Sequence, residues 1–208
     1  MLSVLVTNIK GGCGKTTIAT NLATAFAQGG FRTALADVDR QKSSLTWLKS
    51  RPDTMPAIMG LDWRKGMDKV PEDVQRLVID VPAGLSIGDV DDLVREADLL
   101  LIPVLPSTFD EGSTRRFLDR LDRIKPIRKG KKSVLVVANR VRQRSRSAQR
   151  QLAFLADVGH GPVATIHDRA IYDETACSGL GIFDLDARKA EEFRRDWLPL
   201  ISIVEDAA

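Results

Sequence analysis

A glycine-rich segment near the start of the chain carries the clearest chemistry. It reads Lys-Gly-Gly-Cys-Gly-Lys-Thr-Thr from residue 10, after a short apolar run and before a stretch with helical spacing of apolar residues. Glycines let backbone N–H groups turn inward, and a helix N-terminus adds further donors. We expect this loop to bind a nucleoside triphosphate, with Lys15 on the β- and γ-phosphates and Thr16 on Mg²⁺. The residues expected to hold the nucleotide here are Gly11, Gly12, Cys13, Gly14, Lys15, Thr16 and Thr17.

Three aspartates follow apolar runs that are typical of strands. Asp37 and Asp39 close the run 33–38, and residues at i and i+2 on a strand point to the same face. Asp80 follows three aliphatic residues, the position at which phosphate-loop enzymes place an aspartate that binds Mg²⁺, often through water. Solvated turn carboxylates are the alternative for each. The order of the segments along the chain favours a metal and phosphate site.

These side chains need a scaffold that brings several strand ends together. Apolar runs predict strands at 2–8, 33–38, 75–81, 97–105, 133–138 and 163–166. Periodic stretches predict helices at 16–28, 89–96, 111–124, 145–156 and 190–204, the last interrupted by Pro199. This alternation predicts an α/β fold, a mostly parallel twisted sheet with helices on both faces and the site at one edge. The stretch 51–74 is irregular, and residues 1–208 are expected to form a single domain.

Composition narrows the class of protein. The chain has 208 residues, of which 43% are hydrophobic and 28% charged, as in ordinary globular proteins. Two cysteines are too few for a disulfide scaffold, and they make no zinc site with the isolated histidines. No apolar stretch approaches the ~18 residues of a membrane span. We therefore expect a cytoplasmic protein without membrane attachment.

Basic residues gather in one part of the sequence. Eleven of the 31 lysines and arginines lie between Arg123 and Arg150, a span without Asp or Glu, which leaves 20 basic against 28 acidic residues elsewhere. A basic segment on an acidic body favours a polyanionic partner. A solvated charged face is the alternative.

The glycine-rich loop resembles the deviant Walker A box of the ParA/MinD family of P-loop ATPases. The ordinary P-loop has a glycine where this chain has Ile9, and this chain has an additional lysine, Lys10. The resemblance implies binding and hydrolysis of ATP with Mg²⁺, and a homodimer that forms on ATP binding. It also implies that Lys10 reaches across that dimer to the partner's nucleotide. Lys10 is therefore expected to be catalytic, as is Lys15 through its contact with the β- and γ-phosphates.

The resemblance extends to the aspartates. Asp37-Val38-Asp39-Arg40-Gln41 is similar to the family's Asp-x-Asp-Pro-Gln box, with Arg40 in place of proline. By this resemblance Asp39 orients or activates the attacking water, Asp37 supports the magnesium shell, and Asp80 joins Thr16 at the metal. The Val-Pro-Ala-Gly segment after Asp80 is similar to the family's continuation.

Three further positions match the family less specifically. Asn139 is expected to read the adenine edge, because the amide both donates and accepts hydrogen bonds; a turn asparagine is the alternative. Asp110 lies in a family-like segment but could equally cap a helix, so no chemistry is assigned to it. Arg169 resembles part of a loop near the nucleotide and the dimer edge.

The basic span favours the ParA-type members, which bind DNA without sequence specificity when ATP is bound. The predicted function is partition or positioning of a plasmid, a chromosome region or a protein assembly on the nucleoid, with a ParB-like or cargo-linked stimulating protein. A MinD-like membrane-associated ATPase and an ATP-dependent metabolic enzyme on the same scaffold are the alternatives; the acidic end of the chain disfavours the first. The expected DNA contacts are Arg128, Lys129, Lys131, Lys132, Arg142, Arg144, Arg146 and Arg150.

Overall fold

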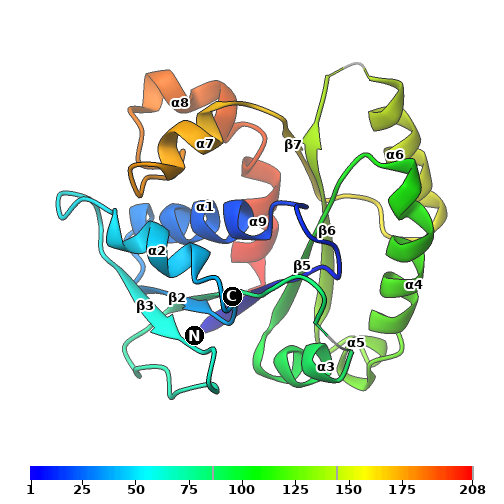
Figure 1. The fold of residues 1–208 in the computed structure, drawn as a ribbon, viewed down its shortest axis with the longest axis horizontal. Helices are drawn as coiled ribbons and strands as arrows, with labels where there is room; N and C mark the ends of the chain where they lie inside the picture. The colour runs from blue at the N-terminus through cyan, green and yellow to red at the C-terminus, as the bar shows by residue number, and fades with distance from the viewer. Residues whose placement is uncertain (86, 144, 208) are drawn as a thin grey trace.

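The computed structural model describes residues 1–85, 87–143 and 145–207. Its strands form one sheet in the order β3-β2-β4-β1-β5-β6-β7, and each neighbouring pair is parallel (Figure 1). The predicted α/β class is confirmed. The strands are β1 (Leu2–Val6), β2 (Thr33–Asp37), β3 (Ile58–Asp62), β4 (Arg76–Asp80), β5 (Leu99–Val104), β6 (Ser133–Val141) and β7 (Ala164–His167).

Helices cover both faces of the sheet (Figure 1). One face carries α1 (Lys15–Gln28), α2 (Ser43–Lys49), α7 (Ile171–Ala176), α8 (Ala187–Arg194) and α9 (Leu198–Asp206). The other carries α3 (Ile87–Glu96), α4 (Glu111–Leu121), α5 (Lys125–Arg128) and α6 (Arg146–Asp157), with a short 3₁₀ turn, η1 (Thr108–Asp110), before α4. In the described part of the chain, no helix combines the length and the apolar character needed to cross a membrane.

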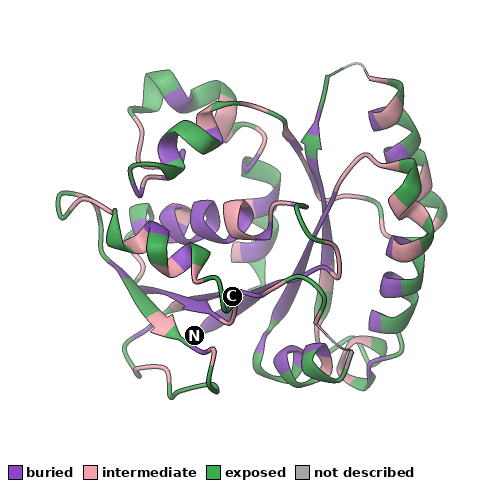
Figure 2. Ribbon diagram, viewed as in Figure 1, coloured by how far each residue is buried: buried purple, intermediate pink, exposed green. Residues whose placement is uncertain are grey.

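The core consists of two apolar layers, one on each side of the sheet. In β1, Val4 and Val6 pack toward α1 whereas Leu5 packs toward α3 and α4, because successive residues of a strand point to opposite faces. The central strands are therefore buried on both sides (Figure 2). This double burial explains why their sequences are continuous apolar runs rather than alternating ones.

The structure corrects several predicted boundaries. The irregular stretch 51–74 contains β3, which was not predicted because it is an edge strand whose middle residues are exposed. The helices α2 and α7 were also missed, and both are short. The predicted helix 190–204 is two helices, α8 and α9, with Pro199 in the first turn of α9, where its missing N–H costs nothing.

Candidate nucleotide-binding site

The glycine-rich loop joins the end of β1 to the start of α1. Gly12 and Gly14 have φ angles of 71° and 89°, the left-handed region that favours glycine. At Gly14 a side chain would also overlap the amide nitrogen of Asn139. Both the backbone angle and the lack of space beside Asn139 therefore require glycine at this position.

Lys15 lies inside this loop. Its side chain is largely buried, and its Nζ donates a hydrogen bond to the carbonyl oxygen of Lys10 at 2.9 Å. Cys13 is also buried, and burial raises the pKa of its thiol, so the thiol stays protonated near neutrality. The ammonium group of Lys15 is therefore held inside the loop, and its contact with a phosphate stays a prediction.

Thr16 and Asp80 form the centre of the candidate metal site. The Thr16 hydroxyl donates to Asp80 Oδ2 at 2.8 Å. The other oxygen, Asp80 Oδ1, is buried without a hydrogen-bond partner among the described residues, and burial raises the pKa of this carboxyl to about 7. A buried carboxylate with an unused oxygen is costly unless a cation meets it. This donor set, oxygen ligands at the end of a phosphate loop, fits Mg²⁺.

Asp37 lies next to Asp80, because the two residues are register partners on β2 and β4. It is fully buried, and its Oδ2 accepts hydrogen bonds from the Ser44 hydroxyl at 2.8 Å and the Leu45 N–H at 3.1 Å. Its Oδ1 accepts the Asp39 N–H at 2.9 Å. Asp37 therefore fixes the turn from β2 into α2 and adds negative charge beside Asp80. A direct place in the magnesium shell stays a prediction.

Asp39 reaches the pocket that opens in front of the loop. This pocket has a volume of about 380 Å³, and Asp39 lines it together with Gly11, Lys15 and Thr16. The Asp39 side chain is half-buried, and its Oδ1 accepts the Gln41 N–H at 2.9 Å. Its carboxylate is thus placed by the same turn that Asp37 holds, and the water-orienting role stays a prediction.

The far wall of the pocket was only partly expected from the sequence. In this wall the sequence indicates only Arg169 near the nucleotide. The wall also includes His167, Asp168, Tyr172 and Asp173. His167 Nδ1 lies 2.8 Å from Asp196 Oδ2, and Tyr172 accepts a hydrogen bond from the indole N–H of Trp197 at 3.0 Å. The wall is therefore fixed by the segment that joins α8 to α9. Because that segment is distant in the sequence, no local motif reveals these contacts.

Asn139 connects this wall to the loop. It is not at the end of its strand as predicted, because β6 continues to Val141 through an irregularity at which Arg140 takes a φ of 53°. Its Nδ2 donates to the Cys13 carbonyl at 2.7 Å. The amide therefore holds the phosphate loop, and its predicted contact with adenine stays a prediction.

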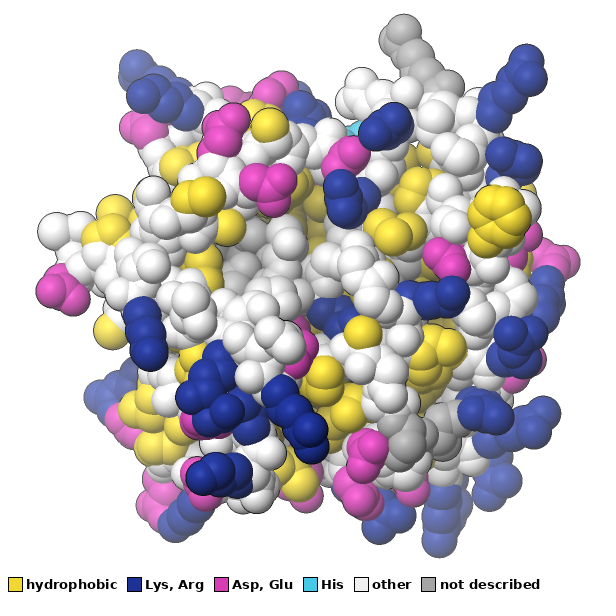
Figure 3. All heavy atoms as spheres, in the orientation of Figure 1, with side chains coloured by type: hydrophobic (Ala, Val, Ile, Leu, Met, Phe, Trp, Pro, Cys, Tyr) yellow, Lys and Arg dark blue, Asp and Glu magenta, His cyan; other side chains and the backbone are white. Residues whose placement is uncertain are grey.

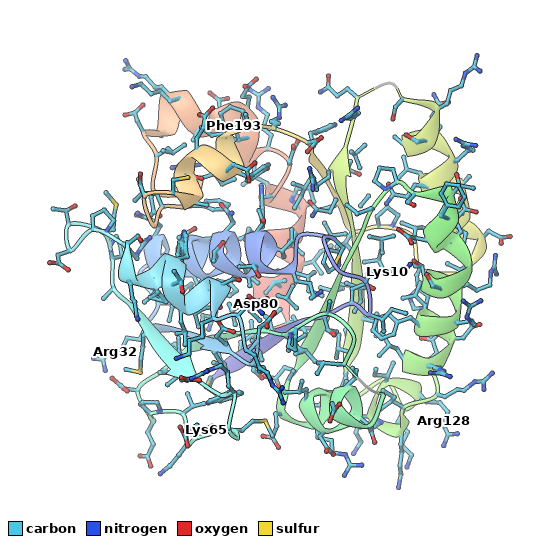
Figure 4. The ribbon with its side chains drawn as sticks, viewed as in Figure 1. Lys10, Arg32, Lys65, Asp80, Arg128 and Phe193 are labelled. Atoms are coloured by element: carbon cyan, nitrogen blue, oxygen red, sulfur yellow. The ribbon has the colours of Figure 1, made fainter. Side chains whose placement is uncertain are left out.

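Lys10 points away from its own pocket toward η1. Its Nζ, on the side chain labelled in Figure 4, forms an ion pair with Asp110 Oδ1 at 2.6 Å. This contact lowers the pKa of the Asp110 carboxyl. Asp110 precedes α4, but its side chain makes no capping hydrogen bond. The partner of Asp110 is thus Lys10, a role that the sequence did not identify.

The basic span does not fold into one surface. Lys131 and Lys132 precede β6, whereas Arg142 follows it, and a nine-residue strand is about 30 Å long. Arg128 and Lys129 belong to the first group, at the edge of the sheet away from the loop (Figure 4). Arg146 and Arg150 lie on α6 with the second group. Arg144 falls outside the described residues.

A different basic cluster, not predicted, lies after the ends of β2 and β3. Arg40 and Lys42 follow β2 while Arg64 and Lys65 follow β3, and the register of Asp37 with Asp62 brings the two segments to the same edge. Asp62 pairs with Arg64 at 2.7 Å and Lys42 at 3.6 Å, and the Arg64 hydrogen bonds lower the pKa of Asp62. Figure 4 labels Lys65 in the lower left part of the view, and Figure 3 shows Lys and Arg side chains gathered in that part of the face. The missed strand β3 is the reason that the sequence did not reveal this cluster.

Comparisons with known proteins agree with this geometry. The maintenance of carboxysome distribution protein A of Halothiobacillus neapolitanus is 28% identical over 193 residues, covering 89% of this chain and 88% of that protein. The structure of a Cyanothece McdA variant in complex with ATP has a TM-score of 0.75 at 18% identity and covers 100% of this chain and 96% of the other. The MinD cell division protein of Aquifex aeolicus has a TM-score of 0.76 at 18% identity, with coverage of 99% and 97%.

Similarity to the solved structures supports the fold, and the family assignment rests on the sequence. The CobQ/CobB/MinD/ParA nucleotide binding domain matches residues 4–182, from β1 to the segment that follows α7. The match spans the phosphate loop, the three aspartates and the pocket wall up to Asp173. The chain belongs to the CobQ/CobB/MinD/ParA family of nucleotide-binding domains.

Proposed function

We propose that this protein is a positioning ATPase that binds ATP with Mg²⁺, dimerises on ATP and hydrolyses it slowly. The observation that carries the proposal is the pair of Thr16 and Asp80, whose hydrogen bond leaves Asp80 Oδ1 buried and without a partner among the residues described. Beside them, a loop with two left-handed glycines and a buried lysine provides the donors that a triphosphate requires.

The proposed mechanism assigns a task to each side chain. Backbone N–H groups of the loop and Lys15 hold the β- and γ-phosphates, and Thr16 and Asp80 hold the metal. Bound Mg²⁺ would supply positive charge to the phosphate oxygens. Asp39 orients the attacking water from the edge of the pocket. Lys10 exchanges its bond with Asp110 for the nucleotide of a second copy, where it stabilises charge that develops in the transition state.

An exposed aromatic side chain beside the ion pair of Lys10 and Asp110 supports dimerisation on this side of the protein. Phe109 is 99% exposed and directly precedes Asp110, the partner of Lys10. A fully exposed phenylalanine beside a site that a second copy must approach is typical of an interface residue, because its burial on association is favourable.

Proteins that resemble this chain support a proposal for the task of the ATPase. One is named for maintaining carboxysome distribution, and another, from Borrelia burgdorferi, is a plasmid partition protein. We propose that this protein likewise positions a cargo, that its ATP-bound dimer binds nucleoid DNA without sequence specificity, and that a ParB-like or cargo-linked protein stimulates hydrolysis. Lysine and arginine side chains of the two basic groups, before and after β6, would give this binding by contacting DNA phosphates.

The last helix gives little support to membrane attachment. In α9, Leu200 and Val204 are buried in the core and Glu205 pairs with Arg76 at 2.6 Å. A helix that binds a membrane surface must instead present a continuous apolar face. The large apolar side chains that α9 does expose, Leu198 and Ile203, are five positions apart and lie on different sides of the helix.

The test combines three measurements on the purified protein: Mg²⁺-dependent ATP hydrolysis, the mass in solution with ATP or ADP, and binding to random-sequence duplex DNA. We expect the protein to dimerise and to bind DNA in a salt-sensitive manner only when ATP is present, and Lys10→Ala should abolish both properties. A protein that binds ATP yet stays monomeric and ignores DNA would contradict the positioning role and favour a metabolic enzyme on the same scaffold. ATP-dependent binding to anionic liposomes would favour the membrane-associated role.

A further inference from the structure

A groove lies between α3 and the segment where α4 leads into α5. Its volume is about 870 Å³, and its walls include Arg95 on α3, Arg120 on α4 and Lys125 on α5. The chain passes from α5 into the start of β6, whereas the nucleotide pocket lies at the other ends of the strands. The groove is therefore near the end of the sheet at which β6 begins, opposite the site where a second copy is expected.

Four of the five charged side chains that line this groove are basic, and Asp91 is the fifth. Among its walls, Arg95 pairs with Asp91 at 3.1 Å, but Arg120, Arg123 and Lys125 form no ion pair within the described residues. Outside the groove, Lys132 donates a hydrogen bond to the Arg95 carbonyl at 3.2 Å and adds another cation beside it. Cations around one concave surface attract a negatively charged occupant.

The lining of the groove includes two apolar side chains. Pro126 is half-buried, and Ile124 is 9% exposed. The methylene stems of the surrounding arginine and lysine side chains extend this apolar surface. DNA offers phosphates to a basic surface but draws little benefit from apolar side chains. A helix with an apolar stripe and acidic flanks complements both the apolar and the basic side chains of the groove.

We propose that this groove docks an acidic amphipathic helical segment of a partner protein. The proposal goes beyond the ATPase cycle, because the residues that line the groove and those that line the nucleotide pocket are different sets. Docking there leaves the phosphate loop and Lys10 free. The segment therefore binds equally with ATP, with ADP and without nucleotide.

The experiment uses the full-length protein and a labelled synthetic helical peptide with a leucine stripe flanked by glutamates. Two control peptides replace either the leucines by serine or the glutamates by glutamine. The groove variant is the double substitution Arg120→Ala and Arg123→Ala. Its matched control is Arg188→Ala with Lys189→Ala, which removes the same charge from exposed positions on α8. Thermal unfolding and ATP affinity are measured for each protein, so that failure of the ATPase proposal is seen separately.

We expect the peptide to bind the unaltered protein, and both control peptides to bind at least about tenfold more weakly. The groove variant should bind the peptide about tenfold more weakly, while the α8 variant and the choice of nucleotide should leave the affinity unchanged. The proposal is overturned if the peptide does not bind, or if the α8 variant weakens it equally. It is also overturned if the serine peptide binds as well, or if a 30-base-pair duplex binds the groove with the same dependence on Arg120 and Arg123, since the surface would then be a polyanion site.

Discussion

Lys10 and Asp110 form an ion pair within one chain, with 2.6 Å between Nζ and Oδ1. The proposed cycle requires the same ammonium group to reach the nucleotide of a second copy. The intramolecular pair therefore competes with dimerisation, and its strength sets part of the cost of closing the dimer. The side chains are 39% and 25% exposed, so this cost is that of a surface pair, up to about 1 kcal/mol.

Substitution of Asp110 by asparagine should make dimerisation easier. We expect Asp110→Asn to lower the ATP concentration for half-maximal dimer by roughly two- to fivefold, which corresponds to the free energy of such a pair. Sedimentation velocity at several ATP concentrations measures this. Asp119→Asn, an exposed acidic position on α4, controls for the change in net charge. A weaker dimer in Asp110→Asn would show instead that Asp110 supports the interface.

The pair of Thr16 and Asp80 predicts a separation between stability and ligand binding. Asp80→Asn removes a buried carboxyl whose Oδ1 has no hydrogen-bond partner among the described residues. We expect the free protein to unfold at the same or a higher temperature, because a costly buried charge is gone. The increase in Tm caused by Mg²⁺ and ATP together should disappear. Differential scanning fluorimetry with EDTA or Mg²⁺ tests both statements, and an Asn variant that keeps the Mg²⁺-dependent increase would exclude Asp80 from the metal site.

Asn139 offers a choice between two roles that ligands can distinguish. If its bond to the Cys13 carbonyl holds the loop, Asn139→Ala should weaken the binding of ATP, GTP and inorganic triphosphate alike, by about five- to tenfold for removal of one buried hydrogen bond. If the amide reads adenine, only the binding of ATP should weaken. Isothermal titration with the three ligands makes the comparison. The structure favours the first result.

The sequence allowed the fold class and the phosphate loop to be predicted because both depend on local patterns. The apolar runs of β1, β4 and β5 are buried on both faces, and Gly14 is required at its place by both its φ angle and its closeness to Asn139. The remainder depends on tertiary pairing. Basic residues before and after β6 lie on separate surfaces because the strand runs between them, and the cluster around Arg64 exists because β3 pairs with β2. The bond between Lys10 and Asp110 joins residues one hundred positions apart, so no local spacing could reveal it.

A buried ion pair predicts one position at which substitution should strongly destabilise the fold. Arg51 and Asp184 are 5% and 0% exposed at their side chains and meet through two contacts of 2.8 Å. Asp184→Ala should lower the free energy of unfolding by roughly 3–5 kcal/mol, because it leaves the guanidinium buried and unpaired. Urea denaturation measures the decrease, and Asp186→Ala, an exposed N-cap carboxylate nearby, should cost only about 1 kcal/mol.

The contribution of this pair should also depend on pH. Burial of Asp184 favours its neutral form, but hydrogen bonds from Arg51, the Gly181 N–H and Gln28 outweigh burial and lower its pKa. A carboxyl with a lowered folded-state pKa contributes stability that is fully present above its unfolded pKa of about 4 and disappears as pH falls through the folded value. The difference in stability between the unaltered protein and Asp184→Ala should therefore be constant from pH 8 to pH 5 and shrink below pH 4. A difference that grows on acidification would contradict this assignment.

The two ends of β6 can be tested as separate DNA surfaces. In a dimer closed over the nucleotide pockets, the basic residues after β6 would lie at the shared edge, whereas those before it would lie at the outer ends. One triple alanine variant therefore replaces Arg142, Arg146 and Arg150, and the other replaces Arg128, Lys129 and Lys131. We expect the first to abolish ATP-dependent binding to duplex DNA and to reduce the slope of log K against log salt by about 0.9 for each phosphate that is no longer neutralised. The second should lower the affinity of the ATP-bound protein for DNA less than the first does.

Fluorescence anisotropy between 50 and 200 mM salt separates these two patterns. A third triple variant, in which Arg188, Lys189 and Arg195 are replaced by alanine, removes the same charge from exposed positions in and next to α8 and controls for net charge. Because long-range attraction of DNA depends on net charge, only a decrease larger than that of this control indicates a local phosphate contact. If the first two variants lower the affinity for DNA equally in the presence of ATP, both basic groups belong to one DNA-binding surface. The dimer would then have to bring the outer ends together.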